Sequence, residues 1–376
     1  MTVRELLAGP LAQEGPWTTV VADVSRDLAD PKRTVDLRHR SLIDDLEAQG
    51  APKADRDAVH AALVADHDTP SPCARYVAVR AGEVVIDEIL QTELHDDGSA
   101  WFGPVLDPLP LLVRAQAEFD AILVEAQRGG GTITRIRLGW APDAEAEHIE
   151  GRTDTLHKVP VGGWSQARYQ RHAEETWRQN EAQLAERIDA LVTELHPRIL
   201  VVGGDIRAVE LLSKALSAAA QQLLWTVPLE TAPPDVPDAL SARFEEAVAA
   251  VIAEDERVAL ERIHSRTGGE GRQEALGIGE VVAALQSGQV GTLLVRGRQA
   301  DERTVIALDA QPWVSTAPEG DFAAGELGIV PASVGLARAA VLTDADVIVT
   351  APGELPGDEP AAALLRWPVG PAVPAV

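Results

Sequence analysis

The residues best suited to chemistry in this chain lie in one run, Gly162-Gly163-Trp164-Ser165-Gln166-Ala167-Arg168-Tyr169-Gln170-Arg171. The chain has a formal net charge of -26, yet it contains no Asp or Glu from Thr155 to Ala173. The basic residues in that stretch are Lys158, Arg168 and Arg171, joined by His157 and His172. Paired glycines permit a close backbone approach, and cations bind phosphates, so the run predicts a local contact with RNA. Acidic charge elsewhere keeps the remaining surface away from nucleic acid.

The same run resembles the glycine-rich loop of the archaeo-eukaryotic release factor family, which includes Pelota and its bacterial relatives. In that family the loop reads Gly-Gly-Gln-Ser, two residues, Arg, an aromatic residue, one residue and Arg. The positions that match without a gap are Gly162, Gly163, Ser165, Arg168, Tyr169 and Arg171. Trp164 is the departure, because it stands where the family has its glutamine.

The resemblance implies that the loop enters the peptidyl-transferase centre of the large ribosomal subunit. In the family, the backbone N–H that follows the glycines stabilises the oxyanion when peptidyl-tRNA is hydrolysed. Trp164 keeps such an N–H, but it lacks the small amide side chain that places water and adds a bulky indole. We therefore expect no hydrolysis. The enzymatic alternative is a peptidyl-tRNA hydrolase that uses Gln166 or the Trp164 backbone.

The resemblance also implies a set of rRNA-binding residues. In this role Trp164 stacks on unpaired bases, and the basic side chains hold phosphates. The set is Lys158, Gly162, Gly163, Trp164, Ser165, Gln166, Arg168 and Arg171. Taken singly, the glycines fit an ordinary turn, the arginines a solvated helix face and the tryptophan a core position, so the hypothesis depends on their coincidence. We expect no catalytic residue, cofactor or metal site.

The elements that must position the loop follow from periodicity. An apolar run at 119–124 and the alternating 132–138 predict strands, and residues 165–196 predict a long helix. The apolar stripe of this helix is Tyr169, Ala173, Trp177, Leu184, Ile188, Leu191 and Leu195, with Arg168, Arg171 and Arg178 on the opposite face. A strand at 199–202 then turns through Gly203-Gly204-Asp205 into another helix. That turn is a weak phosphate-binding signal, for which a plain strand-to-helix turn is the simpler interpretation.

The flanking segments complete the predicted α/β organisation. Before the loop, residues 17–24 predict a strand, 34–49 and 53–66 predict helices, and 76–79 with 83–86 predict a hairpin. After it, 239–265 predict a helix and 290–295 a strand; with 275–285 and the terminal 361–367, these resemble the third domain of Pelota and the release factors. We predict three domains: a diverged N-terminal α/β domain at 1–108, a central mixed-sheet α/β domain with the glycine loop at 109–233, and a C-terminal α/β/α sandwich at 234–376.

Bulk composition excludes several classes of protein. A single cysteine, Cys73, excludes an internal disulfide framework and a cysteine-rich zinc site, and it fits a cytoplasmic location. Met1–Pro16 contains no basic stretch followed by an apolar core, so no secretion signal is expected. No apolar run approaches the length of a membrane span, and the acidity argues against general coating of nucleic acid, DNA included.

These inferences favour a bacterial ribosome-binding factor of hibernation or rescue type that occupies the A site without catalysis. The chain resembles most closely the bacterial hibernation factors of the Balon type, which implies elongation factor Tu as a delivering partner. Neither a membrane nor DNA is expected as a partner. Besides the hydrolase, one further alternative is a stress-induced interaction protein that has kept only the fold.

Overall fold

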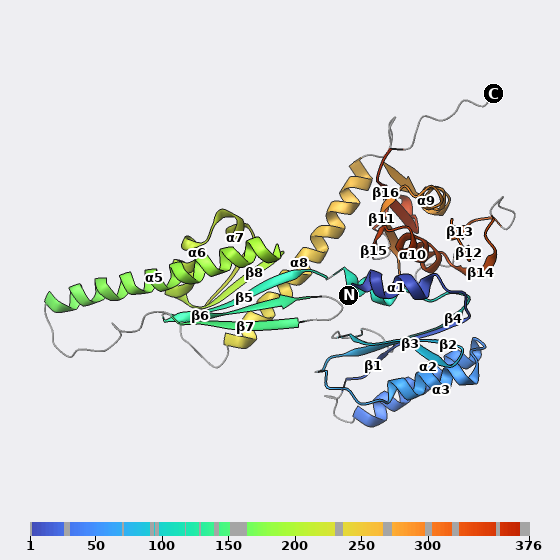
Figure 1. Cartoon of the computed structure of the whole chain (residues 1–376), viewed down its shortest axis with the longest axis horizontal. Coiled ribbons are helices and arrows are strands. Elements are labelled where there is room, and N and C mark those ends of the chain that lie inside the picture. Colours follow the sequence, from blue (N-terminus) through green and yellow to red (C-terminus); the bar gives the residue numbers. More distant parts are fainter. Residues whose placement is uncertain are drawn as a thin grey trace. The chain divides into compact units, whose positions relative to one another are not determined.

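The structure is a computed structural model (Figure 1). It describes residues 2–25, 31–69, 71–90, 94, 98–116, 118–127, 129–138, 143–150, 164–229, 236–265, 273–297, 303–317, 323–350 and 354–368. The chain forms two compact units, one of Met1–Gln116 with Glu256–Val376 and the other of Ala117–Asp255. Helices and sheets build both units, which confirms the predicted α/β class. The predicted boundaries of three domains stay a prediction.

The central unit contains a mixed sheet in the order β7-β6-β5-β8-β9. The strands β5, β8 and β9 are parallel, whereas β5, β6 and β7 pair antiparallel. The mixed sheet predicted for this region is thereby confirmed. The strands are β5 (Asp120–Gln127), β6 (Gly130–Arg137), β7 (Asp143–Glu150), β8 (Ile199–Asp205) and β9 (Leu224–Leu229).

Helices cover both faces of this sheet (Figure 1). One face packs against α5 (Trp164–Leu195), α6 (Ile206–Ala215) and α7 (Ala218–Gln222), and the other packs against the first part of α8 (Val236–Ser265). Side chains alternate between the two faces of a strand, so Ile122 and Val124 point to α5 while Ala121 points to α8. The central sheet is therefore the support on which α5 is mounted.

The edge strand β7 was not predicted from the sequence. Its residues, Asp-Ala-Glu-Ala-Glu-His-Ile-Glu, alternate small and charged side chains rather than apolar and polar ones. The strand nevertheless pairs with β6 along its whole length. Pairing to a neighbour and ion pairs such as Arg135 with Glu145 stabilise it in place of an apolar face.

The first part of the other unit has a sheet in the order β3-β2-β1-β4. The two predicted helices pack on one face of this sheet, with Val20 and Val77 in the shared core. The predicted hairpin is present, and Ala81 and Gly82 both have positive φ, as a tight two-residue turn requires. The elements are β1 (Trp17–Asp23), α2 (Pro31–Ala48), α3 (Lys53–Leu63), β2 (Ala74–Arg80), β3 (Glu83–Leu90) and β4 (Ser99–Gly103).

The second part of that unit has a sheet in the order β10-β16-β11-β15, with a smaller sheet, β13-β12-β14, beside it. Ala259 and Ile263 of α8 pack on one face of the larger sheet, and α9 and α10 also pack against it. This agrees with the predicted sandwich of helices and sheet. The elements are β10 (Glu274–Leu276), α9 (Gly277–Gln286), β11 (Val290–Arg296), β12 (Thr304–Leu308), β13 (Val314–Ser315), β14 (Glu326–Pro331), α10 (Ala332–Leu342), β15 (Asp346–Thr350), η2 (Pro356–Asp358) and β16 (Ala361–Leu365).

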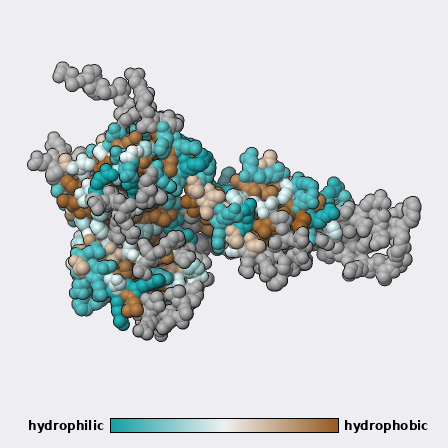
Figure 2. Space-filling model, turned by 180° about the vertical axis from the view of Figure 1, so that it is seen from behind, coloured by the Kyte–Doolittle hydropathy of each residue, from teal (hydrophilic) through white to brown (hydrophobic). Residues whose placement is uncertain are grey.

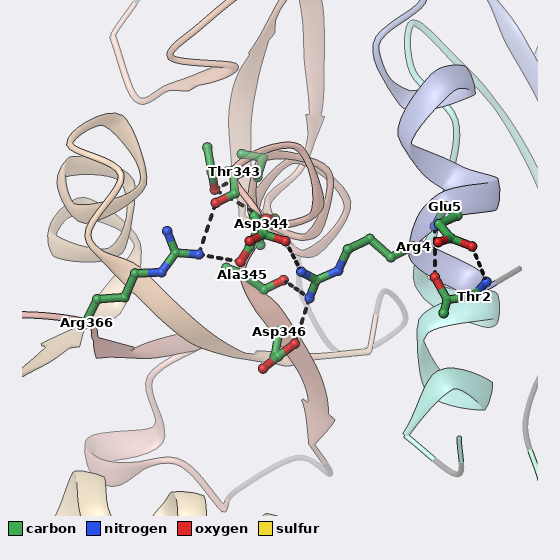
Figure 3. Close-up of polar contacts among 10 residues, drawn as sticks. Thr2, Arg4, Glu5, Thr343, Asp344, Ala345, Asp346 and Arg366 are labelled. Atoms are coloured by element: carbon green, nitrogen blue, oxygen red, sulfur yellow. Dashed lines mark hydrogen bonds and ion pairs between the residues drawn. The ribbon is translucent and has the colours of Figure 1, made fainter. Parts of the chain in front are cut away.

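Two short helices of the first segment, α1 (Val3–Leu11) and α4 (Leu109–Ala115), were not predicted, and α1 is joined by polar contacts to the turn between α10 and β15 (Figure 3). Arg4 pairs with Asp344 and, at 2.6 Å, with Asp346. The fully buried Arg338 of α10 donates from Nε to the carbonyl oxygen of Leu11 at 2.8 Å. Segments from the two ends of the chain therefore form one packed unit.

Candidate nucleic-acid interface

The predicted interface divides between residues that the structure describes and residues that it does not. Lys158, Gly162 and Gly163 lie outside the described residues. Helix α5 begins at Trp164. Its first turns contain the remaining members of the predicted set, which are Trp164, Ser165, Gln166, Arg168 and Arg171. The predicted long helix is confirmed, and its start places these residues on the helix rather than in the loop before it.

The N-terminus of α5 has an unusual charge distribution. The partial positive charge of a helix N-terminus normally favours acidic residues there, at about 0.3–1 kcal/mol each. The first turn of α5 contains no acidic residue, and basic residues follow at Arg168 and Arg171. By contrast, α1 has a full capping box of Thr2 and Glu5. The start of α5 thus concentrates positive potential that an external anion, such as a phosphate, would neutralise.

The helical spacing leaves Arg168 without an acidic neighbour on its own helix. Side chains three and four positions apart are the ones that pair on a helix surface. The residues at these positions around Arg168 are Trp164, Ser165, Arg171 and His172. The sequence therefore places no acidic residue three or four positions from Arg168.

Elsewhere in the described part of the central unit, most basic residues lie in ion pairs. The pairs are Arg135–Glu145, Arg178–Glu175, Arg187–Glu147, Arg198–Asp255, Lys214–Glu210 and Arg243–Glu246. The surface drawn in Figure 2 mixes hydrophilic and hydrophobic residues on the described part of this unit. Each of these pairs cancels its own charge, so these basic side chains offer little positive charge to an RNA backbone.

The C-terminal half of α5 anchors the helix. Leu184, Ile188 and Leu191 are fully buried in the core between the helix and the sheet. Arg178 lies on the exposed side and pairs with Glu175 at 2.7 Å. The two-faced helix predicted from the sequence is thereby confirmed for these residues. In Figure 1 the other end of α5 extends beyond the ends of β6 and β7.

Glu181 is a residue of this helix that the sequence analysis missed. Its side chain is only 1% exposed, and neither carboxylate oxygen has a hydrogen-bond partner. Burial, and secondarily the nearby charge of Asp205, raises the pKa of Glu181 to about 8. A signal was available in the sequence, because Glu181 is four residues after Trp177 and three before Leu184 and so interrupts the apolar stripe.

The Gly203-Gly204-Asp205 segment is built as the end of a strand and the cap of a helix. It belongs to β8, and the Asp205 side chain accepts hydrogen bonds from the backbone N–H groups of Arg207 and Ala208 at 3.0 and 3.3 Å. Gly204 has φ of +127°, and a Cβ there would lie 2.1 Å from the carbonyl oxygen of Ala126. Because Asp205 already occupies the N-terminus of α6, the plain-turn interpretation holds and the phosphate-binding one does not.

Two findings concern other classes of site. Among the described residues, no group of three or more His, Cys, Asp and Glu side chains is arranged to hold a metal ion. In the described part of the chain, every helix is too short or too polar to cross a membrane.

Comparison with known proteins finds a family model that matches the central region. Residues 120–269 match the family model of the bacterial archaeo-eukaryotic release factor family 2. This region includes the glycine loop and all of α5 and α8. For this region, the match agrees with the resemblance inferred from the loop, at the level of the bacterial release factor family.

The similar proteins extend over more of the chain but at low identity. The uncharacterized proteins MT2704 and Rv2629, from two strains of Mycobacterium tuberculosis, are 25% identical over 325 residues, which cover 83% of this chain and 82% of theirs. Pelota of Archaeoglobus fulgidus is 13% identical, with 97% of this chain and 92% of that chain covered and a TM-score of 0.38. A ribosome-bound archaeal Pelota with ABCE1 is 13% identical, with 98% and 95% covered and a TM-score of 0.40.

Proposed function

We propose that this protein is a bacterial ribosome-binding factor of hibernation or rescue type, which occupies the A site and reaches the peptidyl-transferase centre through the Gly162-Gly163-Trp164 loop. The observation that carries the proposal is the acid-free start of α5, which combines a helix N-terminus with Arg168 and Arg171 in an otherwise acidic chain. The family match of residues 120–269 supports a release-factor-like, ribosome-associated role. Pelota itself has been described bound to a ribosome.

The distribution of charge supports RNA rather than protein as the ligand of this surface. Phosphates are the commonest target of arginine side chains and of helix N-termini in nucleic-acid complexes. The described arginines near the core of the central unit, Arg187 and Arg198, are already paired with acidic side chains. The proposed contacts to ribosomal phosphates are Arg168, Arg171 and Lys158, the basic residues of the acid-free stretch. Trp164 is the base-stacking residue in this proposal.

The proposed factor binds without hydrolysing peptidyl-tRNA. Trp164 replaces the family's glutamine, and Gln166, the nearest amide, lies in the first turn of α5. A residue inside a helical turn is directed by the helix, so Gln166 is poorly suited to replace an amide at the tip of the loop. We propose that occupancy of an idle ribosome, as in Balon-type factors, is the function, with elongation factor Tu as the delivering partner.

The test is co-sedimentation of the purified protein with bacterial ribosomes, comparing wild type with Arg168→Glu plus Arg171→Glu. We expect the wild type to pellet with ribosomes and the variant to remain in the supernatant. Binding of the wild type should also weaken as salt is raised, because phosphate contacts release counterions. A matched control is Arg207→Glu plus Lys214→Glu, which makes the same charge change at exposed positions of α6 and should pellet like wild type.

Three outcomes would contradict the proposal. If the wild type does not pellet, even with elongation factor Tu and GDP, ribosome binding fails. If the control loses binding as much as the test variant, only net charge matters and the α5 surface has no special role. If purified ribosomes carrying peptidyl-tRNA release peptide with the wild type but not with Gln166→Ala, the protein is a hydrolase.

A further inference from the structure

Glu181 lies one turn before the anchored C-terminal half of α5. On its C-terminal side, the fully buried Leu184 and Ile188 fix the helix to the sheet. On its N-terminal side are the turns that begin at Trp164. Thr176 and Asn180, close to Glu181 along the helix, are also buried, so this part of the buried face is polar rather than aliphatic. Any change at Glu181 therefore acts on the base of the segment that bears the predicted interface.

Among the described residues, no basic side chain is paired with Glu181. Asp205, at the end of β8, acts on it with a negative charge, and the exposed Arg207, Glu210 and Lys214 lie along α6, which follows. The charged residues of β6 and β7 that are described in ion pairs are Arg135 with Glu145 and Glu147 with Arg187. The short helix α7 has no charged residue. Among the described residues, the charge that acts on the Glu181 carboxyl group is thus the like charge of Asp205, and the buried residues beside it along α5 include the polar Thr176 and Asn180.

Burial in such a place selects the neutral form of the group. Burying an ionised carboxylate without partners costs much free energy, whereas burying a protonated carboxyl group costs far less. Burial and Asp205 raise the pKa of Glu181, so the neutral form persists at neutral pH. Ionisation would require water to reach the group, and water can reach it only if the adjoining turns of α5 lift from the sheet.

We propose that the buried Glu181 carboxyl group is a positioning residue, which holds the turns of α5 around Thr176 and Asn180 in the packed central unit and releases them when the group ionises. The docking part of the inference concerns the helix alone. Its consequence for ribosome binding rests on the proposed function. The proposed partner is still the ribosome. The new element is that the position of the α5 N-terminus depends on whether the Glu181 carboxyl group carries its proton.

The direct test is amide hydrogen exchange, read by mass spectrometry on peptides from residues 164–181 at pH values from about 6.5 to 9 and corrected for intrinsic rates. In wild type we expect protection at low pH, with a loss of about tenfold per pH unit once the group ionises. Glu181→Gln mimics the protonated form and should keep its protection throughout. Glu186→Gln, an exposed change of the same kind on the same helix, should behave like wild type.

The second test repeats ribosome co-sedimentation at both ends of that pH range. We expect wild type and Glu186→Gln to lose binding at high pH, and Glu181→Gln to retain it. If no variant binds ribosomes but the exchange of α5 follows the expected pattern, the proposed function fails and the positioning role stands. If wild type and Glu181→Gln show the same exchange at every pH, the positioning role is overturned, and this result depends on no ribosome.

Discussion

The two halves of α5 belong to one continuous helix but are stabilised in different ways. The half that includes Leu184, Ile188 and Leu191 is held by aliphatic side chains against the sheet. The half that begins at Trp164 has a basic, acid-free start, and a buried carboxyl group at Glu181 lies at its base. The half with Leu184, Ile188 and Leu191 thus has the composition expected for a stable packed helix. The half that begins at Trp164 departs from that composition.

The difference between the two halves shows which residue types lower the stability of the folded protein. An apolar residue at position 181 and an acidic residue in the first turn would each be expected to stabilise the fold. Departures of this kind are the positions where function, rather than stability, accounts for the residue type. The contrast between the halves therefore separates residues that hold the helix from residues that present it to a partner.

The largest expected effect is in the anchored half. Ile188→Ala removes a fully buried side chain between α5 and the sheet, and such changes cost about 2–5 kcal/mol in the free energy of unfolding. Urea denaturation followed by circular dichroism measures this loss. A cost near that of a surface substitution would mean that the core does not anchor α5, and the comparison of the two halves would fail.

A pH-dependent effect is expected at the junction. Because the pKa of Glu181 is raised to about 8, the folded protein retains this proton at pH values where the unfolded chain has lost it. Stability from this group is therefore complete below the unfolded pKa and declines as pH rises to about 8. Each pH unit in this window costs at most about 1.4 kcal/mol, so Glu181→Gln should gain about 2 kcal/mol over wild type between pH 6 and 9.

Parallel urea titrations of wild type and Glu181→Gln over that pH range provide the measurement. The difference between the two proteins is the quantity to follow, because other groups titrate equally in both. A constant difference would show that Glu181 is ionised in the folded protein throughout the window. The junction would then be an ordinary part of the anchored half.

The smallest effect is expected on the exposed face of α5. Arg178 is solvent-exposed and pairs with Glu175 three residues before it. Exposed pairs of this kind contribute little because solvent screens them, so Arg178→Ala should leave the free energy of unfolding almost unchanged. The same denaturation experiment tests it. A cost comparable with that of Ile188→Ala would place Arg178 in a structural role and remove the distinction between the faces of the helix.

Much of the fold followed from local pattern. The two-faced periodicity of α5, the strands β5, β6 and β8, and the hairpin at Ala81-Gly82 were predicted, because their apolar spacing or turn residues are distinctive. The strand β7 was missed, since its alternation of alanine with acidic residues lacks an apolar face. The helices α1 and α4 were also missed, and α1 depends on partners as distant as Asp344 and Arg338.

The candidate site divides in the same way. Residue type and spacing identified the glycine pair, Trp164, Arg168 and Arg171, because the absence of acidic residues is visible in the sequence alone. Gly203-Gly204-Asp205 remained open between two interpretations until the Asp205 side chain was found to cap α6. The sequence shows that Glu181 interrupts the apolar stripe of α5, but it does not show that the side chain is buried near Asp205.

The sequence by itself determined the α/β class, the long helix, the charge of its first turns and the resemblance to release factors, because each of these depends on residues that are neighbours along the chain. Only the tertiary structure decided which carboxyl groups are buried, which arginines are neutralised and which glycines are required by a neighbouring strand. These properties depend on groups such as Asp205 and Glu181, which are far apart in sequence and meet only when α5 packs on the sheet. The energy of a charge is set by the medium and the charges around it, and folding alone creates that medium.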